Sequence, residues 1–302
     1  MKTVKAFTQG LPDAGAAPIV PAATISANPL VTALRNASYE VLPFRGTADA
    51  VIACVPRDLP VSITMTASKG IDATVELAVT LASAGYTVTP HLAARMFEDA
   101  DQVSRTVDRL IAARATGAFV VAGDLPTARG PFADSVSLIE HLDGLGRPFA
   151  RIGVGGYPEG HARIEQAAID TALQAKAAHA TEVVTQLCFT PGTVVDWARE
   201  VHADGLTAPI RVGLPGAVTR QKLVRISAGL GLGQSARFLS KQQNLLWRFL
   251  LPGGYRPDRL IRGLAPHLGT DGHGLSGFHF FTFNEIARTE LWRAAWLRRV
   301  EG

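Results

Sequence analysis

The chain has 302 residues, 47% of them hydrophobic and 19% charged, with a formal net charge of +4. This composition suits a folded globule and excludes a disordered chain, and the cations form no long run of the kind that binds nucleic acid. No window approaches the roughly 18 apolar residues of a membrane span. The N-terminus lacks the apolar core of a signal peptide, so we expect a cytoplasmic protein. Cys54 and Cys188 lie outside any C-x-x-C motif and are expected to be reduced thiols.

Residues 1–37 are rich in Ala and Pro and predict an irregular N-terminal extension, with one helical turn near "NPLVTALRN". From residue 38 onward, short apolar runs typical of strands alternate with segments of helical periodicity such as 70–85 and 97–117. Eight strands are predicted, near 38–43, 60–66, 87–91, 118–123, 150–155, 182–188, 209–213 and 276–282.

Strands that alternate with helices favour parallel βαβ units, and eight such units predict a (β/α)8 barrel, here one catalytic domain over 38–302. An extra helical segment, 229–268, precedes the last strand. The main rival is a doubly wound open sheet. That fold usually carries a Gly-rich turn after its first strand, whereas this chain has "LPFRG" there.

Polar residues late in the predicted strands are the informative ones, because barrel active sites form at the carboxyl ends of the strands. They are Glu40, Thr64, His91, Asp124, Tyr157, His161, Gln186, Gln221 and His279. Each alone has a structural alternative: Glu40 could be an ion-paired carboxylate, and His91 a hydrogen-bonded core histidine. As a set they predict one polar rim. No metal-ligand spacing and no G-x-S-x-G nucleophile motif is present. In "GLGLGQ" the spacing lacks the third Gly of a G-x-G-x-x-G dinucleotide fingerprint, and no strand is predicted before it.

Six motifs resemble those of the methylenetetrahydrofolate reductase family, in the family's order. "SYEVLPFR" resembles S-F-E-F-F-P-P-[RK], "PHLAA" resembles P-H-L-T-C, and "AGDLP" resembles R-G-D-x-P. "GVGGYPEGH" is similar to G-V-A-G-Y-P-E-G-H, "TEVVTQLCF" to I-T-Q-[LF]-F-F-D, and "GFHFFTFN" to F-H-F-Y-T-L-N. The resemblance covers residues 38 to about 295. It implies a (β/α)8 barrel that reduces 5,10-methylenetetrahydrofolate to 5-methyltetrahydrofolate, with hydride passing from NAD(P)H through bound FAD.

The resemblance also implies roles for individual residues. Glu40 matches the family's general acid, which opens the five-membered folate ring by protonation. Burial in an apolar strand favours the protonated form of a carboxyl group, which suits this role. Asp124 matches an aspartate near flavin and pterin, and Gln186 and Gln221 match glutamines that contact folate. The implied cofactor-binding positions are Thr64, His91, Gly123, Asp124, Tyr157, His161 and Lys176.

Departures from the family motifs bear on the cofactor. Ala122 replaces an arginine, and Glu285 stands where an arginine often contacts substrate. Less positive charge for a pyrophosphate predicts weak FAD retention. Two other functions stay open: a related one-carbon barrel enzyme, flavin-independent or serving a demethylation pathway, and a non-catalytic folate- or flavin-binding barrel. We expect a folate partner, no nucleic acid and no membrane; a homo-oligomer stays open.

Overall fold

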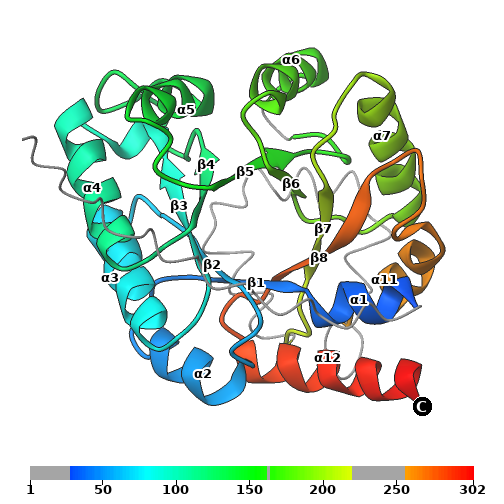
Figure 1. Ribbon diagram of the computed structural model, residues 1–302. Coiled ribbons are helices and arrows are strands. Elements are labelled where there is room, and N and C mark those ends of the chain that lie inside the picture. The colour runs from blue at the N-terminus through cyan, green and yellow to red at the C-terminus, as the bar shows by residue number, and fades with distance from the viewer. Residues whose placement is uncertain (1–27, 162–163, 220–255) are drawn as a thin grey trace, which may run out of the picture.

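Eight parallel strands close into a barrel in a computed structural model that describes residues 28–161, 164–219 and 256–302. The strands follow one another around the barrel in chain order, and β8 pairs with β1 to close it (Figure 1). They are β1 (Ser38–Val41), β2 (Val61–Ile63), β3 (Val88–Ala93), β4 (Gly117–Val121), β5 (Arg151–Gly156), β6 (Glu182–Thr185), β7 (Ile210–Pro215) and β8 (Leu275–Phe281). This confirms the predicted (β/α)8 barrel, with all eight strands within a few residues of their expected places.

Helices surround the barrel and cover the outer faces of its strands (Figure 1). In the described residues they are α2 (Thr47–Cys54), α3 (Gly70–Ser83), α4 (Ala100–Ala112), α5 (Ser135–Gly144), α6 (Gln166–Ala177), α7 (Pro191–Ala203), α11 (Asp258–Leu264) and α12 (Ile286–Glu301), with short 3-10 turns η1 (Ala94–Met96) and η2 (Ala265–His267). The sequence did not predict α2. None of these helices is long and apolar enough to cross a membrane.

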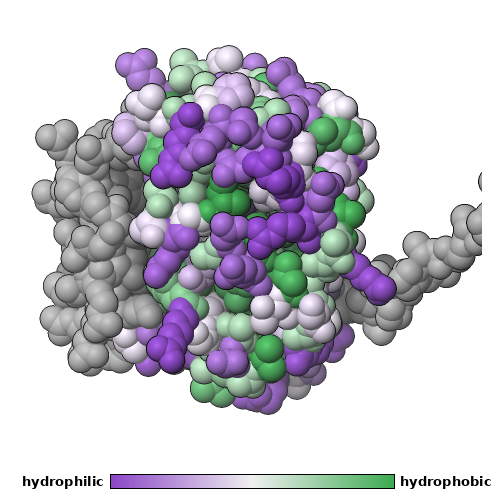
Figure 2. Space-filling view, turned by 90° about the vertical axis from the view of Figure 1, so that its left-hand side faces the viewer, coloured by the Kyte–Doolittle hydropathy of each residue, from purple (hydrophilic) through white to green (hydrophobic). Residues whose placement is uncertain are grey.

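The helix ends follow local chemistry. Asp99 and Asp134 cap α4 and α5, each accepting a hydrogen bond from a backbone N–H of the first turn. Gly85 follows the carboxyl end of α3 and has φ +88°, a left-handed conformation that glycine adopts without strain. On the side that carries α3 and α4, hydrophilic residues predominate and hydrophobic ones are scattered (Figure 2). These helices therefore bury their apolar faces against the barrel and expose their polar faces to water.

Helix α1 (Pro29–Arg35) lies within the predicted extension and replaces the single turn expected there. Leu30, Ala33 and Leu34 are buried in the same core as the barrel strands, and α1 packs against α12 and β8. The rest of the expected extension, most of the expected helical segment 229–268, and "GLGLGQ" lie outside the described residues.

Candidate active site

The bore of the barrel is polar. Such bores are usually filled by layers of Val, Ile and Leu. Here the inward positions carry Ser38, Glu40, Ser62, Thr89, His91, Arg151, Glu182, Arg211 and His279, with Phe119 and Val184 among them. Glycine makes room for the aromatic ring, because a Cβ on Gly153 would lie 2.7 Å from a ring carbon of Phe119. A barrel with a polar interior can hold and move protons.

Glu40 is central to this polar interior. It lies on β1, its side chain is 15% exposed, and its Oε2 atom lies 3.4 Å from Nε2 of His279 and 3.5 Å from Nε2 of His91. The backbone carbonyl of Glu40 accepts hydrogen bonds from the hydroxyl and the N–H of Thr282, at 2.6 and 3.2 Å. The backbone of Glu40 is therefore held in place, and its carboxyl group lies beside two imidazoles.

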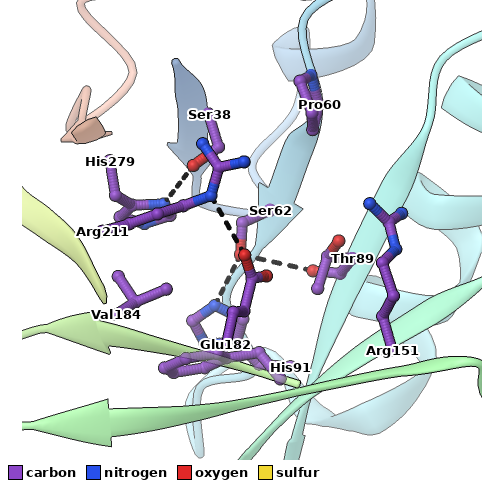
Figure 3. A pocket seen from close by; sticks show the side chains of 11 residues that line it. Ser38, Pro60, Ser62, Thr89, His91, Arg151, Glu182, Val184, Arg211 and His279 are labelled. Atoms are coloured by element: carbon purple, nitrogen blue, oxygen red, sulfur yellow. Dashed lines mark hydrogen bonds and ion pairs between the residues drawn. The ribbon is translucent and has the colours of Figure 1, made fainter. Parts of the chain in front are cut away.

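The two histidines are each bonded to a serine. Nδ1 of His279 lies 2.8 Å from the hydroxyl of Ser38, and Nε2 of His91 lies 2.8 Å from the hydroxyl of Ser62 (Figure 3). Burial lowers the pKa of His91 to about 4, against an opposing effect of Glu40. At neutral pH His91 is thus an uncharged imidazole that can donate or accept one hydrogen bond at Nε2.

His91 and His279 do not lie on the rim that the sequence predicted. Each lies two residues before the end of its strand, inside the bore and almost fully buried, because their strands continue to Ala93 and Phe281. The predicted strand containing His91 ended two residues too early, which made it resemble a rim residue. His91 is therefore not at the rim, where a cofactor was expected, and its contact with a cofactor stays a prediction.

Other predicted site residues do lie at the carboxyl ends of their strands. Thr64 follows β2, where its N–H and hydroxyl donate to the carbonyl of Val41 at 3.0 and 3.3 Å. Gly123 and Asp124 follow β4. Gly123 has φ +89°, and a Cβ there would lie 3.0 Å from Cβ of Ala93, so a larger residue would be crowded and strained. Asp124 is exposed.

Tyr157 and His161 follow β5 and face one another edge to face, with ring centroids 5.6 Å apart. Burial raises the pKa of Tyr157, and the nearby charge of Asp124 raises it further. The loops after β4 and β5 therefore lie close enough to interact. Together they present an acid, a phenol and an imidazole at the barrel mouth.

Gln186 is exposed just past β6. Its N–H donates to the carbonyl of Gly156 at 2.7 Å, and its side-chain oxygen accepts from the N–H of Leu187 at 2.8 Å. Its partner in the sequence prediction, Gln221, lies outside the described residues. Lys176 is on α6, 7% exposed, with Nζ 3.4 Å from the carbonyl oxygen of Gly155. Burial lowers the pKa of this amine, and Asp134 partly offsets the effect.

Two motif residues that sequence reasoning did not single out shape the site loops. Asn284 donates to the carbonyl of Leu42 and the hydroxyl of Thr47, at 3.0 and 2.8 Å, and accepts from the N–H of Leu42 at 2.8 Å. Glu159 accepts from the N–H groups of Phe189 and Thr190, both at 2.8 Å, at the start of α7. Their positions after strands β8 and β5 were a signal that could have indicated such roles.

Sequence reasoning also missed the lower bore residues Ser38, Ser62, Arg151, Glu182 and Arg211. Their signal was a polar residue at an inward position near the start of a buried strand. The rule that barrel active sites form at the carboxyl ends of strands gives no weight to such positions.

The family model described as methylenetetrahydrofolate reductase matches residues 53–228, more than half of the chain. The match begins after β1, so Glu40, and likewise β8, lie outside it. It includes Thr64, Asp124, Tyr157 and Gln186.

Two solved structures from Burkholderia cenocepacia J2315 are also similar to this chain. One is described as a candidate phosphonomutase, with 13% identity, covering 90% of this chain and 96% of that one. The other is described as a candidate lyase/mutase, with 15% identity, covering 90% and 84%. Both have a TM-score of 0.47.

Proposed function

Because the chain belongs to the methylenetetrahydrofolate reductase family, as the match over residues 53–228 shows, we propose that it reduces 5,10-methylenetetrahydrofolate to 5-methyltetrahydrofolate with NAD(P)H, through bound FAD. The observation that carries the proposal is Glu40: a largely buried carboxyl group in the bore, beside two histidines. A non-catalytic binding barrel has no use for such a group.

Glu40 acts as the general acid. It donates one proton from Oε2 to a nitrogen of the folate's five-membered ring, and the ring opens to an iminium that accepts hydride at the methylene carbon. General acids of this kind contribute on the order of 10²- to 10⁴-fold in rate. The bonds from Thr282 hold the backbone of Glu40, so the carboxyl group meets each substrate molecule in the same position.

The rim residues bind and orient the substrate. Asp124 supplies a negative charge beside the bound rings, and Gln186 supplies an amide that can pair with the donors and acceptors of a pterin edge. Gln186 is exposed and Asp124 is exposed, so both are open to a ligand at the carboxyl end of the barrel.

The residues at this mouth fit a planar redox ring. Tyr157 and His161 supply aromatic rings. Gly123 has no Cβ, which would crowd Ala93, so the backbone there is open to a ligand. Bound FAD would supply the redox chemistry that carries hydride from the nicotinamide to the folate. Lys176 is one of the implied cofactor-binding positions, but its amine is buried and hydrogen-bonded to the carbonyl of Gly155, so we expect FAD to be held weakly.

That placement of Lys176, with Ala122 in place of an arginine, also favours a second candidate function: the same folate reduction with hydride passing directly from NAD(P)H, without flavin. The visible absorption spectrum of the purified protein separates the two. A flavin band bleached by NAD(P)H and restored by methylenetetrahydrofolate supports the first, and folate reduction with no flavin band supports the second.

The proposed reaction is tested by Glu40→Gln, with Glu76→Gln, on the exposed face of α3, as the matched control. Glu40→Gln keeps shape and hydrogen bonding but removes the acidic proton. We expect methylenetetrahydrofolate reduction to fall at least about 100-fold while nicotinamide binding is retained. Folate turnover within a few-fold of both the parent and the control would rule out Glu40 as the acid.

A further inference from the structure

We propose that Glu40 receives its proton from the amino-terminal end of the barrel, through a hydrated cavity entered at the Glu182–Arg211 ion pair. The inference rests on the proposed function, because it supplies the proton that this reaction consumes. It assigns a role to a group of bore residues that the folate chemistry does not otherwise use.

The cavity lies in the lower bore, at the end opposite the candidate active site. It has a volume of about 30 Å³ and is lined by residues near the starts of their strands, among them Ser38, Ser62, Thr89, Glu182 and Arg211 (Figure 3). A water molecule needs about 10–15 Å³ of such volume and two to four polar partners. The cavity therefore has room for about two waters, with hydroxyl and charged groups to bind them.

A continuous polar path leads from this cavity to Glu40. Ser38 and His279 both line the cavity, Nδ1 of His279 bonds the Ser38 hydroxyl at 2.8 Å, and its Nε2 lies 3.4 Å from Oε2 of Glu40. His279 thus connects the cavity and Glu40 through two different nitrogens. His91 contacts both Ser62 and Glu40 through Nε2 alone, so its ring cannot carry a proton from one to the other.

The outer end of the path reaches solvent. The side chains of Arg211 and Glu182 are 24% and 23% exposed, whereas that of His279 is 4% exposed. Nε of Arg211 donates to Glu182 at 3.0 Å and its Nη1 donates to the carbonyl of Asn36 at 2.7 Å. Arg151 is turned toward Thr116, to which it donates at 3.1 Å. The amino-terminal opening of the cavity, its mouth, is thus lined by polar groups that can bind water.

The proton balance requires such a supply. Each turnover moves one proton from Oε2 of Glu40 to the folate and leaves a carboxylate. A folate bound at the carboxyl end would cover Glu40 from that side. One proton then passes from solvent to Oε2: Ser38 donates to Nδ1 of His279 and regains a proton from cavity water, while Nε2 of His279 donates to Glu40. The number of protons on each relay residue is unchanged, and the Nε2 tautomer of His279 must be restored before the next turnover. His91, Glu182, Arg151 and Arg211 are the other titratable or charged groups facing this path.

The test closes the mouth with the double variant Glu182→Met/Arg211→Met, which removes both charges together and leaves neither unpaired. The matched control is Asp72→Met/Arg109→Met, an exposed pair between α3 and α4. We expect the mouth variant to lower kcat at least tenfold, increasingly so at high pH, with the KM values for folate and nicotinamide within twofold. Its solvent isotope effect should rise, and the isotope effect of 4-deuterated nicotinamide should fall toward one.

A second readout does not depend on turnover. Exchange of the His279 ring N–H with water, followed by NMR on protein with labelled histidine, should slow at least tenfold in the mouth variant and not in the control. Unchanged exchange and unchanged isotope effects in folded mouth variant would overturn the proposal. Slowed exchange in a protein that never reduces methylenetetrahydrofolate would keep the proton path and reject the folate reaction.

Gly277→Ala provides the test if the double variant does not fold. A Cβ on Gly277 would lie 3.5 Å from Nη1 of Arg211, an ordinary contact, so the methyl group fits while narrowing the mouth. It should slow His279 exchange in the same direction by at least twofold, and exchange equal to the parent would count against the path.

Discussion

Acidification should destabilise the fold through His91, by an amount that the structure allows to be worked out. The imidazole is buried between Glu40 and His279, and burial lowers its pKa from an ordinary 6.5 to about 4. Between these two pH values the unfolded chain binds a proton that the folded chain excludes. The free energy of unfolding is therefore at its full value above pH 6.5 and falls as the pH falls toward 4.

The size of the effect follows from the shift. One pKa unit corresponds to about 1.4 kcal/mol, so the full window is worth about 3 kcal/mol, and the part between pH 7 and pH 5 about 2 kcal/mol. Removing the titrating ring should remove this dependence. His91→Gln keeps a polar side chain beside Ser62 but binds no proton in this range.

The assay is urea unfolding of the parent and of His91→Gln at pH 7 and pH 5. The other titrating groups are the same in both proteins. They include His273, because burial lowers its pKa as well. The parent should lose about 2 kcal/mol more than the variant on going from pH 7 to pH 5. If both proteins lose the same free energy, His91 is not held neutral by burial, and the reasoning is wrong.

Two further predictions concern the loops at the carboxyl ends of the strands. Asn284→Ala leaves the N–H and the carbonyl of Leu42 without their partner and places alanine at φ +60°, so the free energy of unfolding should fall by about 2–4 kcal/mol. Asn284→Asp should lose less. Both variants are measured by urea unfolding, and a stability of Asn284→Ala equal to that of the parent would contradict the prediction. Gln186→Ala should weaken folate binding about ten- to a hundred-fold in a folate titration, with an unchanged melting temperature because the residue is exposed, and unaltered affinity would place the folate elsewhere.

The barrel was predictable from sequence because its signal is repeated eight times. Apolar strand runs and helical periodicity alternate along the chain, so an error of a few residues in one element leaves the pattern intact. The strand predicted near 60–66 is shorter in the structure, Val61–Ile63, and this error does not change the fold. The helix α2 was missed because it is short, Thr47–Cys54, and mixes Ala with Val and Ile in no clear amphipathic pattern.

The site was predictable only in part, since strand ends fix the rim but not the bore. Thr64, Asp124 and Tyr157 lie where the strand positions placed them. His91 lies deeper because its predicted strand ended two residues too early, and a shift of two residues keeps a side chain facing inward and changes only its depth. His279 lies deeper because it is inside both the predicted strand 276–282 and the observed β8, and is not at a strand end. The pairing of Glu182 with Arg211 depends on two strands that are adjacent in space, a relation that the sequence expresses only through the fold.

The contact between β1 and β8 has a consequence for how the protein is made. Glu40 and His279 are 239 residues apart in sequence, and Thr282 and Asn284 join the exit of β8 to that of β1. During synthesis from the amino end, Glu40 is therefore translated 239 residues before His279 and gains its partners only after β8 has been made. Until then β1 has an unpaired edge, which can pair wrongly with other strands. Pairing of β8 with β1 both removes that aggregation risk and assembles the surroundings of Glu40, so a chain that stops before β8 has neither the closed barrel nor the site.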